Sequence, residues 1–322
     1  MRKAQFAKLV ESLKGLTADQ MEQLRAAIST TQAERSSIRA IESSGPLACR
    51  HCGSLHVVRN GTRNGLQRVM CRDCKKTSNA ATGTPLSRLK HKEKFIRYAE
   101  CMRQGMTVRQ AAYEVEVCRD TSFRWRHRFL TNVQAHQPAG VTGILEVDET
   151  YFRESQKGSR TLTRPPRKRG GKATGKGRFS KDWVPVLVGR ARGQPQTVDR
   201  VLAKVNGAEV TDALKKAVVP GETVVCTDGH SAFLHLQRTL GVQTKSFTAS
   251  YACPGLDKVY HVQSANNYHE RLKTWIQRRL RGVATKYLPN YLAWMRLMSW
   301  NKDGVDSDEI VASALGRQVI NL

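Results

Sequence analysis

Apolar residues recur at helical spacing in two parts of the first half of the chain. Residues 1–42 are predicted to form an N-terminal helical segment of two short amphipathic helices, and Thr17 with Gln20 has the spacing of a capping box at the start of the second. The helical period stops at the Ser-Ser-Gly-Pro stretch of residues 43–46 and returns over residues 91–137. A segment of different character therefore separates two helical regions.

The segment at residues 43–90 has short β-prone pieces in place of the helical period. Asn60-Gly61 and Asn64-Gly65 are both hairpin signals, because Asn and Gly adopt the left-handed backbone that tight turns need. The pattern predicts a small β module.

Residues 91–137 are predicted to hold a helix-turn-helix, with Thr107 as the N-cap of its first helix. Phe123 and its apolar neighbours would hold the second helix on the first. The second helix would present a basic face to DNA through Arg119, Arg124, Arg126 and Arg128. The alternative is an ordinary three-helix packing unit with a solvated basic face.

Residues 138–322 mix strand and helix patterns, which predicts a mixed α/β fold. Strands are predicted at residues 143–152, 183–192, 197–205 and 222–230, and helices at 207–218, 231–240 and 267–281. A glycine-rich, basic insert at residues 153–181 has too few apolar residues to fold alone, and we expect it to be mobile without a ligand.

Length and composition limit the classes of protein that this chain can be. Its 322 residues suit two or three compact units, and 39% hydrophobic residues are enough to build their cores. No apolar run is long enough to span a membrane, and the amino terminus lacks the apolar stretch of a secretory signal. We therefore expect a cytoplasmic protein.

The net charge of +27, from 54 Lys and Arg against 27 Asp and Glu, indicates a polyanionic partner. Nucleic acid fits better than a membrane surface, because no basic amphipathic helix with an aromatic face is present.

Four of the eight cysteines form two Cys-x-x-Cys pairs, Cys49 with Cys52 and Cys71 with Cys74, on either side of the predicted hairpin. Two thiolate pairs on tight turns can close a tetrahedron around Zn²⁺. The spacing predicts a structural zinc ribbon, against the alternatives of chance pairs or a redox dithiol.

Two aspartates end predicted strands: Asp148 in ILEVDET and Asp228 in TVVCTDG. If the strands are neighbours, both carboxylates could share divalent metal ions that activate an oxygen nucleophile for phosphoryl transfer. Aspartate at a strand end is also a common turn residue, which is the alternative. Glu149 is expected on the opposite side of the strand, as a surface acid or an outer neighbour of the site.

The blocks VDETYF, TDGHSAF and HVQSANNYHERLKTWIQRRLRGVATKYLPNYLAWMRL resemble the catalytic blocks of insertion-sequence transposases of the ISXO-like group, which have an RNase H-like core. With the zinc ribbon and helical segment in front, the resemblance covers about residues 45–302. It implies a DDE-type enzyme that uses Mg²⁺ or Mn²⁺. The catalytic positions carried over are Asp148, Asp228, Asn266 and Lys273, with the first three as metal ligands.

This sequence has Asn266, followed by Lys273, where a DDE-type enzyme has its third acidic metal ligand, so the identity of the third metal ligand is open. An Asn266 carbonyl oxygen can bind Mg²⁺ but brings no charge. Glu270 shares a helix face with Asn266 and Lys273 and is the rival ligand. In a further alternative, Asn267 and Glu270 form a capping box and Asn266 only precedes the helix.

The resemblance implies a transposase that binds terminal inverted repeats of double-stranded DNA, cleaves the ends and joins them to target DNA. We expect a nucleoid-associated homodimer or higher synaptic oligomer that is not bound to a membrane. The insert would clamp backbone phosphates through Arg167, Lys168 and Arg169. The alternative is a catalytically inactive DNA-binding regulator derived from a transposase. A zinc-ribbon RNA-binding factor is a remote third option, since it would not explain Asp148 and Asp228.

Overall fold

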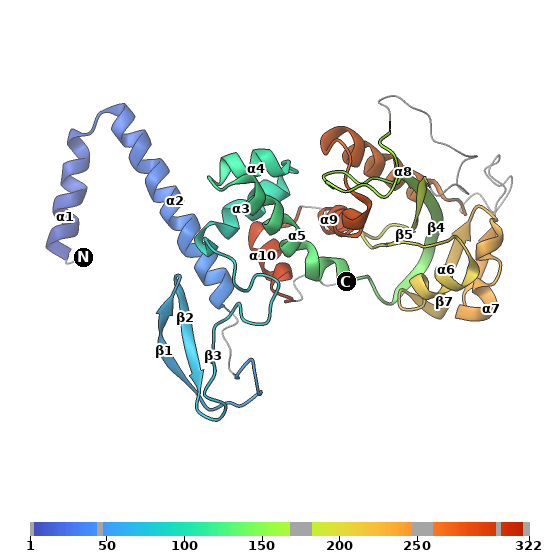
Figure 1. Ribbon diagram of the computed structural model, residues 1–322, viewed down its shortest axis with the longest axis horizontal. Helices are drawn as coiled ribbons and strands as arrows, with labels where there is room; N and C mark the ends of the chain where they lie inside the picture. Colours follow the sequence, from blue (N-terminus) through green and yellow to red (C-terminus); the bar gives the residue numbers. More distant parts are fainter. Residues whose placement is uncertain (1–2, 44–47, 168–181, 247–259, 301–303, 318–322) are drawn as a thin grey trace.

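The computed structural model describes residues 3–43, 48–167, 182–246, 260–300 and 304–317 (Figure 1). The chain begins with helix α1 (Lys3–Ser12) and the longer helix α2 (Ala18–Glu42), joined by the short helix η1 (Leu13–Gly15). The predicted capping box is confirmed, because the Thr17 hydroxyl accepts the Gln20 N–H at 3.3 Å and the Gln20 side chain accepts the Thr17 N–H at 2.9 Å. α2 is a 25-residue helix, longer than the sequence pattern indicated.

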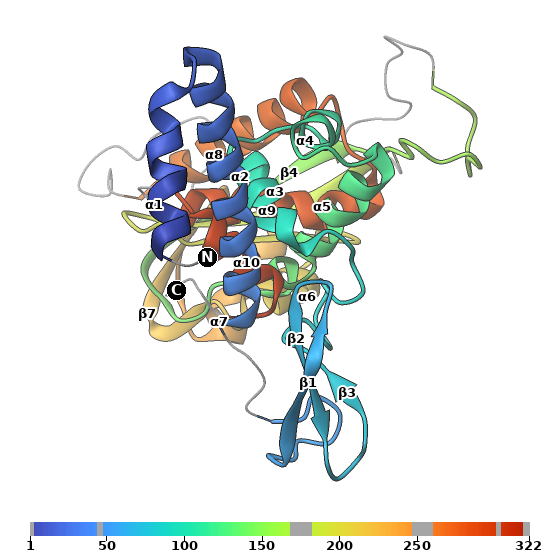
Figure 2. The same cartoon turned by 90° about the vertical axis from the view of Figure 1, so that its left-hand side faces the viewer.

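Three antiparallel strands form the small module: β1 (Val57–Arg63), β2 (Leu66–Cys71) and β3 (Thr77–Ser78). Asn64 and Gly65 make the turn between β1 and β2, both with positive φ. Asn60-Gly61 is not a second turn. It lies inside β1, where the register shifts between Arg59 and Thr62 and Gly61 adopts the positive φ that a bulge tolerates. Figure 2 shows the module extending away from the helices and the larger sheet.

Helices α3 (Phe95–Arg103), α4 (Val108–Glu114) and α5 (Arg119–Ala135) follow, after the short helix η2 (Lys92–Lys94). Phe95 and Tyr98 of α3 meet Trp125 of α5 edge-on, with ring centroids 5.0 and 5.2 Å away. Thr107 caps α4 in a capping box, as predicted for that N-cap. The carboxy-terminal helix α10 (Ser307–Ala314) packs on α3 and α5, so this helical core draws on both ends of the chain.

A five-stranded mixed sheet forms the centre of the second half. Its strands are β4 (Val141–Arg153), β5 (Trp183–Ala191), β6 (Thr197–Val201), β7 (Val218–Thr227) and β8 (Gln243–Ser246), in the order β6-β5-β4-β7-β8. β5 runs antiparallel to both its neighbours, whereas β4, β7 and β8 run parallel. The prediction of a mixed α/β fold is confirmed. β8 escaped prediction because it is short and polar.

Helices cover both faces of this sheet (Figure 1). Residues such as Leu145 and Leu187 face α6 (Gly207–Leu214), the short helix η4 (Ser231–Phe233) and α7 (Leu236–Leu240). Residues such as Val186 and Val188 face α8 (Gln263–Thr274), a π-helical turn η6 (Trp275–Arg279), the short helix η7 (Thr285–Tyr287) and α9 (Leu288–Trp300). Among the helices in the described ranges, none combines the length and apolar character needed to cross a bilayer.

Candidate active site and metal centres

Asp148 and Asp228 meet at one edge of the mixed sheet. β4 and β7 are parallel neighbours whose pairing ends at Glu146 and Cys226, and each aspartate lies just beyond that point. Asp228 follows the end of β7 as predicted, whereas Asp148 lies inside β4, which continues to Arg153 beside β5, so its predicted place at a strand end is wrong. One carboxylate oxygen of each, together with one of Glu149, lies within 4.8 Å of the other two. Parallel pairing aligns the two segments, and this places residues far apart in the sequence in a single acidic cluster where the pairing ends.

Glu149 joins this cluster, although strand alternation directs its Cβ to the opposite face from Asp148, as predicted. The alternative that it is a surface acid is wrong. Its side chain is only 8% exposed, and the Tyr151 hydroxyl donates a hydrogen bond to it at 3.3 Å. The alternation of strand residues fixes the direction of Cβ, but not the position of a carboxylate two bonds further out. Because β7 no longer pairs with β4 at this point, the glutamate can reach around the open edge.

The cluster makes an ionised Asp148 costly. Burial, followed by the charges of Glu149 and Asp228, raises the pKa of Asp148 to about 7, against the opposing effect of Lys273. A divalent cation would relieve this repulsion, and carboxylate oxygens are the ligands that Mg²⁺ and Mn²⁺ prefer. The donor set therefore fits such a metal.

Helix α8 carries the remaining predicted catalytic residues past this cluster. His269 Nδ1 lies 3.7 Å from Asp148 Oδ2, and Lys273 lies one turn later on the same face of α8, where its charge lowers the pKa of Asp148. Asn266 lies two turns earlier and is exposed, on the same face as Lys273. α8 begins at Gln263, so Asn267 is not an N-cap and that alternative is wrong. Glu270 accepts a hydrogen bond from Thr274 at 3.1 Å and does not belong to the acidic cluster.

Glu146, which the sequence analysis did not select, anchors α8 to β4. Its carboxylate is fully buried and accepts the backbone N–H of Ser264 at 2.6 Å and that of Ala265 at 3.3 Å. Arg192 pairs with it at 2.7 Å, and His261 lies 3.4 Å away. The signal in the sequence was a charged residue in the middle of the apolar run GILEV.

His269 is the second residue that was missed. It is 6% exposed, and its Nδ1 lies 3.7 Å from Asp148 Oδ2, while its Nε2 is buried without a hydrogen-bond partner among the described residues. Burial, followed by the charge of Lys273, lowers its pKa to about 4. A neutral imidazole therefore lies beside Asp148. His269 lies three residues after Asn266 and four before Lys273, so the sequence already placed it on the same helix face as these two predicted site residues.

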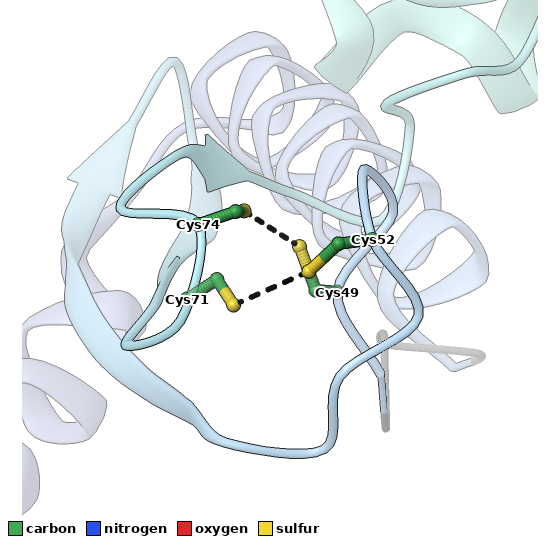
Figure 3. A group of neighbouring side chains, drawn as sticks. All are labelled: Cys49, Cys52, Cys71 and Cys74. Atoms are coloured by element: carbon green, nitrogen blue, oxygen red, sulfur yellow. Dashed lines mark hydrogen bonds between the residues drawn. The ribbon is translucent and has the colours of Figure 1, made fainter.

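The four cysteines of the small module converge as the spacing predicts (Figure 3). Cys49 Sγ lies 3.6 Å from Cys74 Sγ, and Cys52 Sγ lies 3.7 Å from Cys71 Sγ. A zinc tetrahedron with bonds of about 2.3 Å has sulfur–sulfur edges of about 3.8 Å, which is close to both distances. The backbone N–H of Cys74 lowers the pKa of Cys71 to about 6, which favours the thiolate that zinc needs. The donor set fits structural zinc.

The predicted DNA-contacting arginines of α5 divide into two groups. Arg119, Arg124 and Arg128 are exposed. Arg126 is fully buried: it donates to the Met106 carbonyl at 3.0 Å, and its guanidinium lies 4.3 Å from the Trp294 ring centroid. A guanidinium without exposed surface cannot reach a phosphate, so the prediction that Arg126 contacts DNA is wrong.

Phe123 also differs from its prediction. Its ring is 40% exposed and packs edge-on against Tyr287, at 5.4 Å between centroids, rather than holding α5 on α4. Trp125 and Phe129 provide the packing inside the helical core instead.

Arg167 of the basic insert is already occupied within the fold. It pairs with Asp182 at 2.7 Å and with Glu154 at 3.5 Å, and so joins the two ends of the insert. This contradicts its predicted role as a free phosphate clamp. Lys168 and Arg169 lie outside the described residues.

The second half of the chain is similar in sequence to a known protein family. Residues 140–298 match the model of the ISXO2-like transposase domain. A protein from the transposable element ISH50 of Halobacterium salinarum, itself uncharacterised, is 30% identical over 257 residues, which cover 77% of this chain and 84% of the relative.

Two solved structures show weaker likenesses. The catalytic core domain of BIV integrase is 13% identical, with a TM-score of 0.29, over 52% of this chain and 91% of its own. The pre-cleavage Mos1 transpososome is 13% identical, with a TM-score of 0.22, over 68% of this chain and 77% of its own. At these scores neither likeness bears on the fold, which is described by the strand order above. By its sequence match and its relative, the chain belongs to the ISXO2-like family of insertion-sequence transposases.

Proposed function

We propose that this chain is an active transposase that binds the terminal inverted repeats of its element and performs metal-dependent DNA strand cleavage and transfer in an RNase H-like core. The observation that carries the proposal is the meeting of Asp148 and Asp228 at one sheet edge, inside the region that matches the transposase domain. A buried carboxyl group with a raised pKa, as at Asp148, is expensive for the fold and is typical of a functional site.

Asp148 and Asp228 would hold Mg²⁺ or Mn²⁺, with Asn266 of α8 as the third ligand carried over from the family and Glu149 as the acid that the structure adds. When bound, the metal would activate the attacking oxygen, water for nicking or a DNA 3′-hydroxyl for joining, and stabilise the leaving oxygen. Lys273 supplies positive charge beside the acids and would offset the charge of the scissile phosphate.

Glu146 and Arg192 hold the first turn of α8 against β4, and this fixes the distance between the helix residues and the acidic cluster. A site that must place a phosphate between side chains from two elements needs such support, because small displacements reduce rate strongly. His269 would contribute a neutral group that packs beside Asp148 without repelling the metal.

DNA recognition would lie in the amino-terminal half. A zinc ion held by the four cysteines would fix the β module, and α4 with α5 would act as the helix-turn-helix. Arg119, Arg124 and Arg128 are the exposed cations available on α5. Two ends must be held together during transposition, so a dimer or higher assembly is part of the proposal.

The test is incubation of the zinc-loaded protein with a labelled duplex carrying the end of its own element, with Mg²⁺ or Mn²⁺. The wild-type chain should shift the duplex and cut it, and Asp228→Asn should shift it without cutting. Asp212→Asn is the matched control, because Asp212 is a half-buried aspartate that pairs with Arg200 and Lys215 outside the cluster. A wild-type protein that shifts the duplex but yields no cut product would establish the inactive regulator instead.

A further inference from the structure

A groove of about 1010 Å³ lies between the helix-turn-helix and the end of the core. One wall comes from the first turns of α4 and α5, and the other from the segment that follows α8. The groove is distinct from the acidic cluster, because none of the acids of that cluster lines it.

The groove is strongly positive. Asp120 is the single carboxylate among its lining residues. Its exposed cations are Arg109, Arg119, Lys157, Arg278, Arg279, Arg281 and Lys286. Asp120 pairs with Arg119 at 3.1 Å. Arg109, Arg278 and Arg281 have no ion-pair partner within the described ranges, so their charges are available to a ligand.

The walls are held in place by contacts that do not use these free cations. Lys157, at the start of the basic insert, donates to the carbonyl oxygens of Arg281 at 2.9 Å and Gly282 at 2.6 Å. Across the groove, the His127 and Tyr287 rings stack with centroids 4.0 Å apart. The groove therefore has its shape before any ligand arrives, and preorganised cations bind an anion at lower entropic cost.

We propose that this groove receives one sugar-phosphate backbone of the duplex that α5 reads, so that the helix-turn-helix and the core grip the same DNA. The inference deepens the proposed function and rests on it in one respect, namely that the polyanion is DNA. Three observations support this assignment. The row of cations suits the regularly spaced phosphates of DNA, and the groove begins at Arg119, at the amino-terminal end of α5, where a recognition helix enters DNA. Its other wall continues directly from α8.

The consequence concerns the geometry of cleavage. α8 carries Asn266 and Lys273, and Arg278 follows them in the π-helical turn. If Arg278 and Arg281 bind the DNA backbone, the DNA would run from the recognition helix α5 along α8. α8 leads to the acidic cluster. The groove would thus set which phosphate reaches the acids.

The test compares the salt dependence of DNA affinity for two triple variants. The groove variant is Arg278→Gln with Arg281→Gln and Lys286→Gln. The control is Lys204→Gln with Lys216→Gln and Arg238→Gln, three exposed cations that do not line the groove. The probes are a labelled duplex carrying the element end, a random-sequence duplex and a single strand of equal length.

For both duplexes, the slope of log affinity against log salt should fall by up to about 3 in the groove variant, at roughly 0.9 for each lost phosphate contact, and stay at the wild-type value in the control. Replacing Arg278 and Arg281 by lysine should restore most of the slope, which a purely structural role would not. Thermal unfolding should match the wild type in all variants.

A groove variant that keeps the wild-type slope on a duplex that the wild-type chain binds would overturn the groove proposal alone, and cleavage at Asp148 and Asp228 would stand. A loss of slope seen with the single strand only would overturn the duplex assignment. A wild-type chain that binds none of the probes would overturn the groove and the proposed function together.

Discussion

The Glu146 carboxylate of β4 accepts the backbone N–H of Ser264, in the first turn of α8, at 2.6 Å. This contact joins the strand that carries Asp148 to the helix that carries Asn266 and Lys273. Arg192 supplies the compensating charge at 2.7 Å. The acidic cluster and the helix therefore occupy fixed relative positions through a group that would not itself touch DNA or metal.

Glu146→Gln should reduce both stability and cleavage. It keeps the size of the side chain but leaves Arg192 without its charged partner, which we expect to lower the free energy of unfolding by about 2–3 kcal/mol. Cleavage rate should fall more than DNA affinity, because α8 loses its anchor. Chemical denaturation and single-turnover cleavage measure the two effects. Glu222→Gln, at an exposed glutamate, is the control. A Glu146→Gln chain with wild-type stability and rate would contradict the anchoring role.

The raised pKa of Asp148 predicts a pH-dependent cost to stability. The folded chain holds the Asp148 proton up to about pH 7, whereas the unfolded chain releases it near the ordinary value of 3.8. The free energy of unfolding of metal-free protein should therefore decrease as pH rises from about 4 to 7. At pH 8, Asp148→Asn should be more stable than wild type, on the order of 1–4 kcal/mol.

Denaturation at pH 5 and pH 8 measures this difference, which should nearly vanish at the lower pH. Added Mn²⁺ should stabilise the wild type and not Asp148→Asn. An Asp148→Asn chain that is less stable than wild type at pH 8 without metal would show that the acidic cluster does not strain the fold.

The four cysteines should hold one zinc ion per chain. Cys71→Ser should lose the metal and leave the β module open to proteolysis, while the core around the five-stranded sheet stays resistant. Elemental analysis of purified protein and limited proteolysis measure both effects. Cys118→Ser, at an exposed cysteine outside the cluster, should keep the zinc. A Cys71→Ser chain with full zinc content would rule out this site.

Arg124 and Arg126 should behave in opposite ways. Arg124 is exposed, so Arg124→Gln should weaken DNA binding and lower the salt slope by about 1 without changing stability. Arg126 is buried against Trp294, so Arg126→Ala should lower the free energy of unfolding by roughly 2–4 kcal/mol. Fluorescence anisotropy and denaturation separate the two. An Arg126→Ala chain of wild-type stability with impaired binding would restore Arg126 as a DNA contact.

Features set by short-range patterns could be predicted from the sequence. The capping boxes at Thr17 and Thr107 depend on residues three positions apart. The cysteine cluster depends on two local pairs that flank a hairpin. The meeting of Asp148 and Asp228 was accessible because both follow apolar strand segments that pair in parallel, although Asp148 lies inside β4 and not at its end.

Features set by distant packing partners could not be predicted. Arg126 resembles Arg124 and Arg128 in local sequence, and only Trp294, far along the chain, determines that it is buried. The position of Glu149 depends on where β7 stops pairing with β4. The role of Glu146 depends on the start of α8, which the sequence pattern placed several residues too late.

The central claim is that Asp148 and Asp228 together hold a divalent metal ion. Mn²⁺ binding to the zinc-loaded chain, followed by electron paramagnetic resonance in the presence of duplex, tests this most directly. Wild type and Asp212→Asn should bind Mn²⁺ saturably, and Asp148→Asn and Asp228→Asn should each lose that binding while still binding the duplex. Unchanged Mn²⁺ binding in both of these variants would contradict the account.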